Sequence, residues 1–367
     1  MNSFIPVSKP SIGNEEKRRV LEVLDSGILT TGEYTLDFEE KFADYLGNGL
    51  YCAGLNSATN ALFLSLLSLG ITKDDEVIAP TWTFASTAQV VEWLGAKLIL
   101  CEIDKNTLNI DIDELCKLIS PKTKAIIPVH IAGYPCDMDK IKKLANEFDL
   151  KIIEDAAHAI GTEYNGTKIG NHSDAVCFSF YATKNLAMGE GGAVVSKDKN
   201  LIKKIRKLSY LGINKEFYKR YQQKGSWYYD IEELGYKANL DNLHSAIGLE
   251  QLKKIDKMNQ RRNEIANYYY DNLNVEFNKY NNKHYHSYHL FMIRVKNRDD
   301  FMAKLKERNI GTSIHFRPLH VHSFYKNRFK EFKTADNIYE NIVSIPMHAS
   351  LLDSEVDYIV DTINRII

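Results

Sequence analysis

The stretch KAIIPVHIAGYPCDMDKIKKLANEFDLKIIED, residues 124–155, shows most directly how this chain folds. It begins with an apolar run at 124–129, continues with a helix-like segment at 137–148, and ends with a second apolar run at 150–154. A strand, a helix and another strand in this order are typical of two parallel strands joined by a crossover helix. The stretch therefore predicts a βαβ unit in which Asp155 directly follows the second strand.

The same alternation extends from about residue 48 to residue 155. We expect further strands at 75–79 and 97–102, and further helices at 57–69, 84–94 and 111–119. Later apolar runs at 175–180 and 192–196 flank a glycine-rich turn at 189–192. This order predicts an α/β fold whose large domain has three layers, αβα, around a mostly parallel sheet.

The pattern changes beyond about residue 240. Apolar residues recur every three positions at Leu249, Leu252, Ile255 and Met258, which indicates one long connecting helix. Strands are then expected at 288–295 and 313–316, and helices at 299–308 and 353–366. We therefore predict a large domain over residues 1–245 and a smaller C-terminal α+β domain over residues 246–367.

Composition narrows the functional class. The 367 residues include 47 Lys and Arg against 48 Asp and Glu, a net charge of −1, which argues against a nucleic-acid or acidic-membrane partner. Hydrophobic residues make up 44% and charged residues 26%, the shares of an ordinary globular protein. Small-molecule chemistry is therefore the class we expect.

The sequence also predicts a cytoplasmic location. Its five cysteines are odd in number and scattered, with no Cys-x-x-Cys spacing, which is typical of a reducing compartment. The first ten residues lack the apolar core of a signal peptide, and the apolar stretch at 61–71 is too short to span a bilayer. We accordingly interpret Asn165-Gly166 as a hairpin turn rather than as part of a glycosylation site.

Three features could carry chemistry, and each has a simpler alternative. Asp155 lies where open α/β sheets bind ligands, although it could be only a helix cap. Lys184 follows an apolar segment and precedes flexible glycines, so it could form a Schiff base with a carbonyl, although most lysines are surface charges. Ser57 and Thr59 precede an apolar helix whose free N–H groups could bind an anion, although a simple N-cap would look the same.

Taken together, the three features match pyridoxal 5′-phosphate (PLP). This cofactor needs a lysine for its aldehyde, a carboxylate for its ring nitrogen, a cradle for its phosphate and an apolar face against its ring.

The sequence resembles the sugar-nucleotide aminotransferase family, the DegT/StrS group of fold-type I PLP enzymes, nearly from end to end. The segments that carry the likeness are LTTG at 29–32, NSAT at 56–59, PTWTF at 80–84, IEDAAHA at 153–159, the block from Ser179 through Lys184 to GEGG at 189–192, and GYKANL at 235–240. Family members that act as dehydratases carry a histidine in place of the lysine, so Lys184 favours transamination.

The resemblance implies a role for each matching residue. Lys184 would hold the cofactor and move the proton, and Asp155 would pair with the ring nitrogen. His158 would lie near the ring's 3-hydroxyl group. Phe84 would stack on the ring, with Trp82 as the less favoured candidate.

The phosphate of the cofactor would be held by two groups of residues. One group belongs to the same chain: Ser57, Ala58, Thr59 and Ser179. The other is Asn239 of the neighbouring subunit, so the resemblance implies a homodimer with a shared active site. The sequence departs from the family at Ala187-Met188 and Asp241-Asn242, which affects substrate contacts and interface detail rather than catalysis.

Substrate contacts are expected at Thr31, His315 and Arg317, with His315 and Arg317 as charged donors to phosphates or as parts of a solvated loop. The aromatic run at 227–229 could stack on a nucleotide base or pack in the interface. The histidines gathered at 284–289 and 315–322 lack the cysteine or paired carboxylates that would complete a metal site, so no metal is expected.

The resemblance implies a PLP-dependent aminotransferase that converts a nucleotide-linked keto-deoxy sugar to an amino sugar with L-glutamate as donor. The segments at 127–130, 161–162 and 315–317 look more like those of 4-ketosugar enzymes than of 3-ketosugar enzymes. Two alternatives stay open: transamination of a smaller phosphorylated ketone, and a catalytically silent PLP-binding protein of the same fold.

Overall fold

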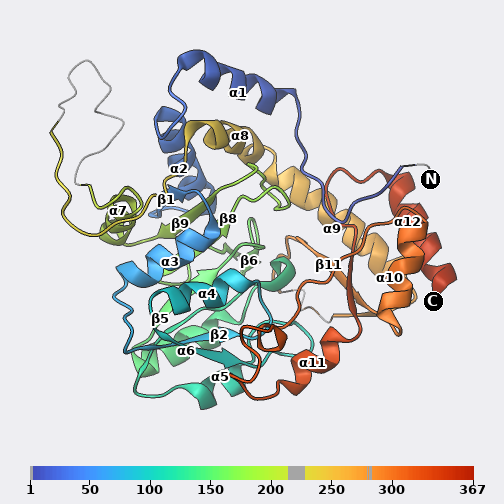
Figure 1. The fold of residues 1–367 in the computed structure, drawn as a ribbon. Helices are drawn as coiled ribbons and strands as arrows, with labels where there is room; N and C mark the ends of the chain where they lie inside the picture. Colours follow the sequence, from blue (N-terminus) through green and yellow to red (C-terminus); the bar gives the residue numbers. More distant parts are fainter. Residues whose placement is uncertain (1–2, 214–227, 279, 281–282) are drawn as a thin grey trace.

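A computed structural model describes residues 3–213, 228–278, 280 and 283–367 of the chain (Figure 1). Its centre is a seven-stranded sheet in the order β1-β9-β8-β5-β4-β2-β3. The bounds are β1 (Tyr51–Leu55), β2 (Glu76–Pro80), β3 (Lys97–Cys101), β4 (Thr123–Ile126), β5 (Lys151–Asp155), β8 (Ala175–Ser179) and β9 (Gly192–Ser196). β9 is antiparallel to β1 and β8, whereas the pairings from β8 through to β3 are parallel. The predicted α/β fold with a mostly parallel sheet is confirmed.

Helices cover both faces of this sheet because successive strand residues point to opposite sides. Val77 and Ala79 belong to one apolar core, and Ile78 between them belongs to the other. The first core is covered by α3 (Ala58–Ser68), α4 (Ala85–Trp93) and α7 (Lys199–Leu208). The second is covered by α2 (Glu33–Leu46), α5 (Ile112–Leu118), α6 (Met138–Phe148) and α8 (Asn242–Leu252), and α1 (Asn14–Ser26) packs on α8. The three layers are therefore helices, sheet and helices.

A smaller antiparallel sheet forms from the C-terminal part of the chain. It contains β10 (Glu276–Phe277), β11 (Phe291–Arg294) and β12 (Ile342–Ile345), and it lies beside α9 (Ile255–Asn272), α10 (Arg298–Glu307) and α12 (Asp353–Ile366) (Figure 1). The helix α11 (Lys333–Tyr339) packs instead on the first core of the large sheet. Ile5, near the N-terminus, joins the apolar core of this region and pairs with Ile310. The boundary at residues 245–246 stays a prediction.

A short hairpin joins β6 (Glu163–Tyr164) to β7 (Thr167–Lys168). Asn165 and Gly166 between them have φ values of 48° and 76°, the left-handed backbone that a tight hairpin turn requires. The predicted hairpin turn is confirmed. Two single-turn helices, η1 (Ile131–Gly133) and η3 (Leu319–Val321), complete the elements that bear on the site.

Two expected elements differ from the structure. The long helix beyond residue 240 is divided into α8 and α9, and the break lies where Gln251 and Lys254 bind Glu16 of α1. The strand expected at 313–316 is a single bridge between Ser313 and Ser344; the backbone bends at His315, whose carbonyl accepts the indole N–H of Trp82.

Among the residues that the structure describes, no helix combines the length and the apolar character needed to cross a membrane. All five cysteines are free thiols, and four of them are buried.

Candidate active site

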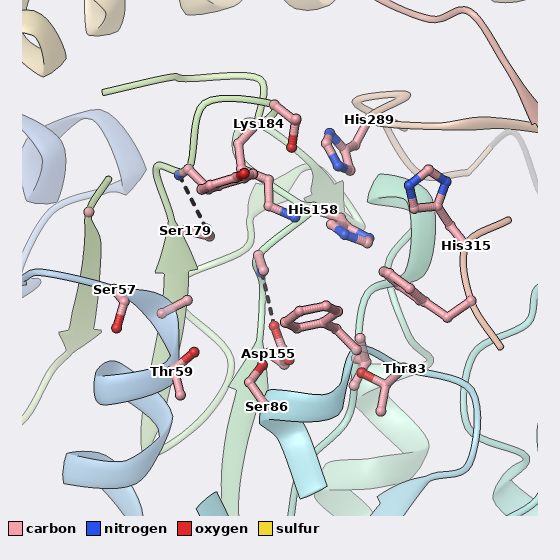
Figure 2. Close-up of a pocket in the computed structure, with 18 of the residues that line it drawn as sticks. Ser57, Thr59, Thr83, Ser86, Asp155, His158, Ser179, Lys184, His289 and His315 are labelled. Carbon is pink, nitrogen blue, oxygen red and sulfur yellow. Dashed lines mark hydrogen bonds between the residues drawn. The ribbon is translucent and has the colours of Figure 1, made fainter. Parts of the chain in front are cut away.

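A cavity of about 530 Å³ opens at the carboxyl ends of β5 and β8. Asp155 is the last residue of β5 and Ser179 the last of β8, so the parallel pairing of the two strands places both side chains at one edge of the sheet. The cavity brings together these residues predicted from the sequence: Ser57, Ala58, Thr59, Phe84, Asp155, His158, Ser179, Lys184 and His315. Figure 2 shows Ser57 and Thr59 on one side of the hollow, His289 and His315 on the other, and Lys184 and Asp155 between them.

The side of the cavity formed by Ser57 is the start of α3. Ser57 has extended backbone and its Oγ accepts the N–H of Asn60 at 3.2 Å, so it is the N-cap that the sequence suggested. The first N–H groups of a helix have no partner within the helix and carry the positive end of its dipole. Gly192 of β9 allows this close packing, because a Cβ there would lie 2.3 Å from the carbonyl carbon of Ser57. The result is an anion cradle next to Ser179.

Asp155 is almost completely buried, with 4% of its surface exposed. Its Oδ2 accepts a hydrogen bond from Thr87 Oγ1 at 2.8 Å, and its Oδ1 accepts the backbone N–H of Ala157 at 3.2 Å. Burial raises the pKa of Asp155, and the bonds from Thr87 and Ala157 together with the nearby charge of Lys184 oppose that rise. The cavity therefore contains a buried carboxylate that can pair with a cationic group.

Lys184 lies in the turn between β8 and β9, where its N–H donates to the carbonyl of Tyr181 at 2.9 Å. Desolvation lowers the pKa of Lys184 to about 8, and attraction to Asp155 limits that fall. In a substantial fraction of the molecules, the side chain of Lys184 is therefore a neutral, nucleophilic amine near physiological pH.

Two neighbouring imidazoles have their tautomers fixed by the hydrogen-bond network. His158 Nδ1 accepts the backbone N–H of Ala132, so its proton is on Nε2. Asn185 donates both amide hydrogens, to Asn259 Oδ1 and to the carbonyl of Ser287, so its Oδ1 accepts the Nδ1–H of His289 at 3.1 Å. The two rings lie 4.3 Å apart, and burial and the charge of Lys184 lower the pKa values of both. The site thus contains one neutral ring that donates through Nε2 and one that accepts through Nε2.

Aromatic rings form one wall of the cavity. Phe84 lines it with 60% of its surface exposed, and its ring lies 5.9 Å from that of Phe316. Phe316 in turn stacks on His158 at 5.7 Å. Trp82 is fully buried beneath this wall and is absent from the cavity lining. Phe84, rather than Trp82, is therefore available for stacking on a ligand, and Tyr181, 47% exposed, is a second exposed ring in the lining.

The side chains present fit the cofactor predicted from the sequence. Lys184 could hold an aldehyde, Asp155 a protonated ring nitrogen, and the hydroxyl groups of Ser57, Thr59 and Ser179 a phosphate. All of them line one cavity whose volume suits a small cofactor and part of a substrate.

Besides Trp82, three predicted residues lie outside the lining of this cavity: Asn239, Thr31 and Arg317. Asn239 donates to Thr31 Oγ1 at 2.7 Å, so these two residues lie together in a separate corner. Arg317 is exposed and donates to the carbonyl of Val321 at 2.9 Å. Trp227 lies outside the described residues.

His315 lines the cavity, but it differs from the charged donor expected there. Its Nδ1 lies 2.9 Å from Ser344 Oγ, and burial together with the charge of Lys184 lowers its pKa to about 4. The ring is therefore neutral at pH 7. Within the described part of the chain, no group of three or more His, Cys, Asp or Glu side chains has an arrangement that could hold a metal ion.

Among the residues with no role predicted from the sequence, Thr83, His289 and Phe316 line the cavity, and Thr87 bonds to Asp155 behind it. The threonines lie in the PTWTF segment or just after it, so a search around that motif could have found them. His289 belongs to a histidine cluster whose sequence pattern suggests only a metal site, and it reaches the cavity from the C-terminal part of the chain. No local signal in the sequence predicts that contact.

Comparison with known proteins agrees with this geometry. A sequence model of the DegT/DnrJ/EryC1/StrS aminotransferase family matches residues 10–364. The chain is 44% identical to the uncharacterized protein MJ1066 of Methanocaldococcus jannaschii and 42% identical to the spore coat polysaccharide biosynthesis protein SpsC of Bacillus subtilis. In each case the match covers 100% of this chain and 98% of the relative.

Solved structures show the same similarity. The sugar aminotransferase Spr1654 from Streptococcus pneumoniae, in its PMP form, matches with a TM-score of 0.91 and 32% sequence identity. The match covers 99% of this chain and 98% of that chain, and a PLP form of the same protein also matches.

Proposed function

The chain belongs to the DegT/DnrJ/EryC1/StrS aminotransferase family, and on that premise we propose that it moves the amino group of L-glutamate onto a nucleotide-linked 4-keto-deoxy sugar. The protein is a PLP-dependent sugar aminotransferase. The sequence-based predictions of family, enzyme class and cofactor are therefore confirmed. We propose L-glutamate as the amino donor and a nucleotide-linked 4-keto-deoxy sugar as the acceptor.

One observation supports the transamination chemistry in this proposal. Lys184, with its lowered pKa, and the buried Asp155 line the same cavity as the hydroxyl groups at the start of α3. A nucleophilic amine, a carboxylate and an anion cradle within one cavity are the groups that PLP chemistry requires.

When bound, PLP supplies an aldehyde that joins an amine and a ring that takes up the electrons left when the substrate's Cα–H bond breaks. Lys184 Nζ would hold the aldehyde of the cofactor, and its amine would move the proton released from the donor's Cα. Asp155 keeps a positive charge at the ring nitrogen through a charge-assisted hydrogen bond.

The remaining side chains hold and orient. Ser57, Thr59 and Ser179, with the N–H groups at the start of α3, bind the phosphate. Phe84 would cover one face of the ring. His158, protonated on Nε2 as the bond from Ala132 requires, donates toward the 3-oxygen of the ring.

The substrate assignment is supported by the rim of the cavity. The neutral His315 lines the cavity, and the exposed Arg317 follows it by two residues, so a hydroxylated sugar bound at His315 would bring its diphosphate toward this loop. The name of the SpsC relative supports a place for the product in the synthesis of a polysaccharide that contains an amino sugar.

We also propose that the active form is a homodimer in which Asn239 completes the partner's phosphate site and Thr31, to which Asn239 donates, contacts the substrate. Exposed apolar side chains lie at the end of α1 and just beyond it, namely Leu21, Leu24, Ile28 and Leu29. The carbonyl groups of Leu29 and Thr30 accept the backbone N–H of Asn242, so this apolar surface lies next to the segment that contains Asn239. An exposed apolar surface of this kind is typical of an interface.

The free cysteines support our proposal of a cytoplasmic location.

Two assays test the function. Conversion of the purified holoenzyme to the amine form of the cofactor by L-glutamate, followed by absorbance, tests the first half-reaction and excludes a silent binding protein. Mass spectrometry of products from a panel of nucleotide-linked 3-keto and 4-keto sugars then identifies the acceptor. Activity with dihydroxyacetone phosphate but with no nucleotide sugar would instead favour the smaller phosphorylated ketone.

A further inference from the structure

Two threonine side chains adjoin Asp155 and have no part in the function proposed above. Thr83 lies just before α4, is 2% exposed and lines the cavity. Thr87 lies in the first turn of α4 and is fully buried. The oxygen atoms Thr83 Oγ1 and Thr87 Oγ1 lie 2.7 Å apart, and Thr87 Oγ1 lies 2.8 Å from Asp155 Oδ2. The two hydroxyl groups therefore form a chain that ends on the carboxyl group.

The direction of this chain follows from counting hydrogens. An ionised carboxylate only accepts, so Thr87 gives its single hydroxyl hydrogen to Asp155, and Thr83 must donate to Thr87. In the reverse direction a protonated Asp155 would donate to Thr87, and Thr87 would donate to Thr83. The hydroxyl hydrogen of Thr83 would then need another acceptor, and within the described residues Thr87 is the one hydrogen-bond partner that Thr83 has. Ala157 N–H donates to the other carboxyl oxygen. The environment of Asp155 therefore matches the ionised form of its carboxyl group.

Burial works against that ionised form, and hydrogen bonds to a charged group work for it. Thr87 contributes one of the two bonds made by described residues to the carboxyl oxygens of Asp155. If Thr87 lost its hydroxyl group, Oδ2 would lose that donor while the site stayed buried. The carboxyl group would then favour its protonated form, which cannot pair with a protonated ring nitrogen.

We propose that Thr83 and Thr87 are positioning residues that keep Asp155 ionised and aimed into the cavity, and that they thereby set how tightly the site holds the protonated ring nitrogen of PLP. This inference rests on the role proposed above for Asp155. A purely structural role is the competing explanation, since two buried hydroxyl groups also satisfy each other and fill space.

The experiment compares two substitutions and two ligands. Thr87→Val keeps the shape of the side chain and removes the hydroxyl group, whereas Thr87→Ser keeps the hydroxyl group. The ligands are PLP and an analogue of PLP that carries a carbon atom in place of the ring nitrogen. The dissociation constant of each ligand from the full-length protein is measured by equilibrium titration, with the unfolding temperature as a control for folding.

We expect Thr87→Val to weaken PLP binding about tenfold, which is the effect of losing one hydrogen bond to a charged group. The same variant should bind the carbon analogue as the unchanged protein does. Thr87→Ser should restore PLP binding. Thr83→Val, one bond further from the carboxylate, should show the same preference with an effect of about threefold, and it serves if Thr87→Val fails to fold.

Equal losses for PLP and the carbon analogue would overturn the proposal, since a packing defect does not depend on the ring nitrogen. Unchanged PLP binding in Thr87→Val would overturn it as well. The Asp155→Ala variant separates this failure from failure of the function. If Asp155→Ala still binds PLP better than the carbon analogue by the same factor as the unchanged protein, Asp155 does not hold the ring nitrogen and the assignment of its role is wrong.

Discussion

The two ends of the site are built in different ways. At the inner end, Asp155 and Ser179 close two central strands, and each is fixed by hydrogen bonds within the same chain. The outer end, called the rim from here on, consists of Arg317, Thr31 and Asn239, which lie outside the cavity lining. Arg317 is exposed on a loop, and Asn239 donates to Thr31. On the function proposed above, one chain would therefore carry the groups for chemistry, whereas substrate recognition and the last phosphate contacts would depend on loops and on a second chain.

Loss of the amine at the inner end should have the largest effect. Lys184→Ala removes both the covalent attachment of the cofactor and the group that moves the proton. We expect the turnover number to fall by about 10⁴-fold or more, because acid–base and covalent catalysis are lost together. Steady-state kinetics with L-glutamate measures this, with Lys203→Ala on the surface of α7 as the matched control.

Turnover near the unchanged level in Lys184→Ala would show that the inner end does not carry the chemistry. The comparison between the two ends would then fail.

Loss of the inner carboxylate should rank second. Asp155→Ala removes the charge opposite the ring nitrogen, so the ring would stabilise the charge that develops when the Cα–H bond breaks less well. We expect a fall in the rate of the glutamate half-reaction of about 10²- to 10³-fold, with the fold retained. Stopped-flow absorbance measures the rate, and Asp113→Ala, an exposed first-turn residue of α5, is the control. A loss below about tenfold would remove Asp155 from the mechanism.

A mixed dimer tests whether the rim belongs to the partner. Asn239→Ala should weaken PLP binding about tenfold, as expected for one hydrogen bond to a charged phosphate. In co-expressed Lys184→Ala and Asn239→Ala chains, each mixed dimer would contain one unaltered site. Activity at limiting PLP should therefore return to about a quarter of the unchanged protein's level, given random pairing of a symmetric dimer.

If the mixture shows no more activity than the average of the two single variants, each site is complete within one chain. The rim would then not differ from the inner end in this respect.

The smallest expected effect is a shift in pH dependence. Only the neutral amine attacks an aldehyde, so PLP uptake by the cofactor-free protein should accelerate with rising pH and level off above about 8, the lowered pKa of Lys184. The three histidines that face it stay neutral in this range, because burial lowers the pKa values of His158, His289 and His315. Asp155→Asn removes the attraction that favours the charged amine, so the midpoint should move to lower pH. A midpoint unchanged by Asp155→Asn would show that the two groups do not face each other.

The inner end could be predicted from the sequence, because regular elements determine where its residues lie. Asp155 follows a buried apolar run, and the ends of neighbouring parallel strands meet at one edge of the sheet. Ser57 was recognisable as the residue before an apolar helix. The role of Lys184 needed the family resemblance, since a lysine in a turn has no periodic signal.

Other parts of the site could not be predicted, because they depend on tertiary contacts. His289 comes from the C-terminal part of the chain, and its tautomer is set by Asn185 and Asn259, which are far apart in sequence. The neutrality of His315 follows from burial that only the folded chain creates. The prediction of a strand at 313–316 was wrong in a region that also makes a tertiary contact, since the carbonyl of His315 accepts the indole N–H of Trp82 there.

The attachment site of the cofactor tests the central claim most directly. The PLP-loaded protein would be reduced with borohydride, digested, and examined by peptide mass spectrometry. We predict one modified peptide, with the label on Lys184, and loss of that label in Lys184→Ala. A label on a different lysine, or an unlabelled protein that still transaminates, would contradict the account.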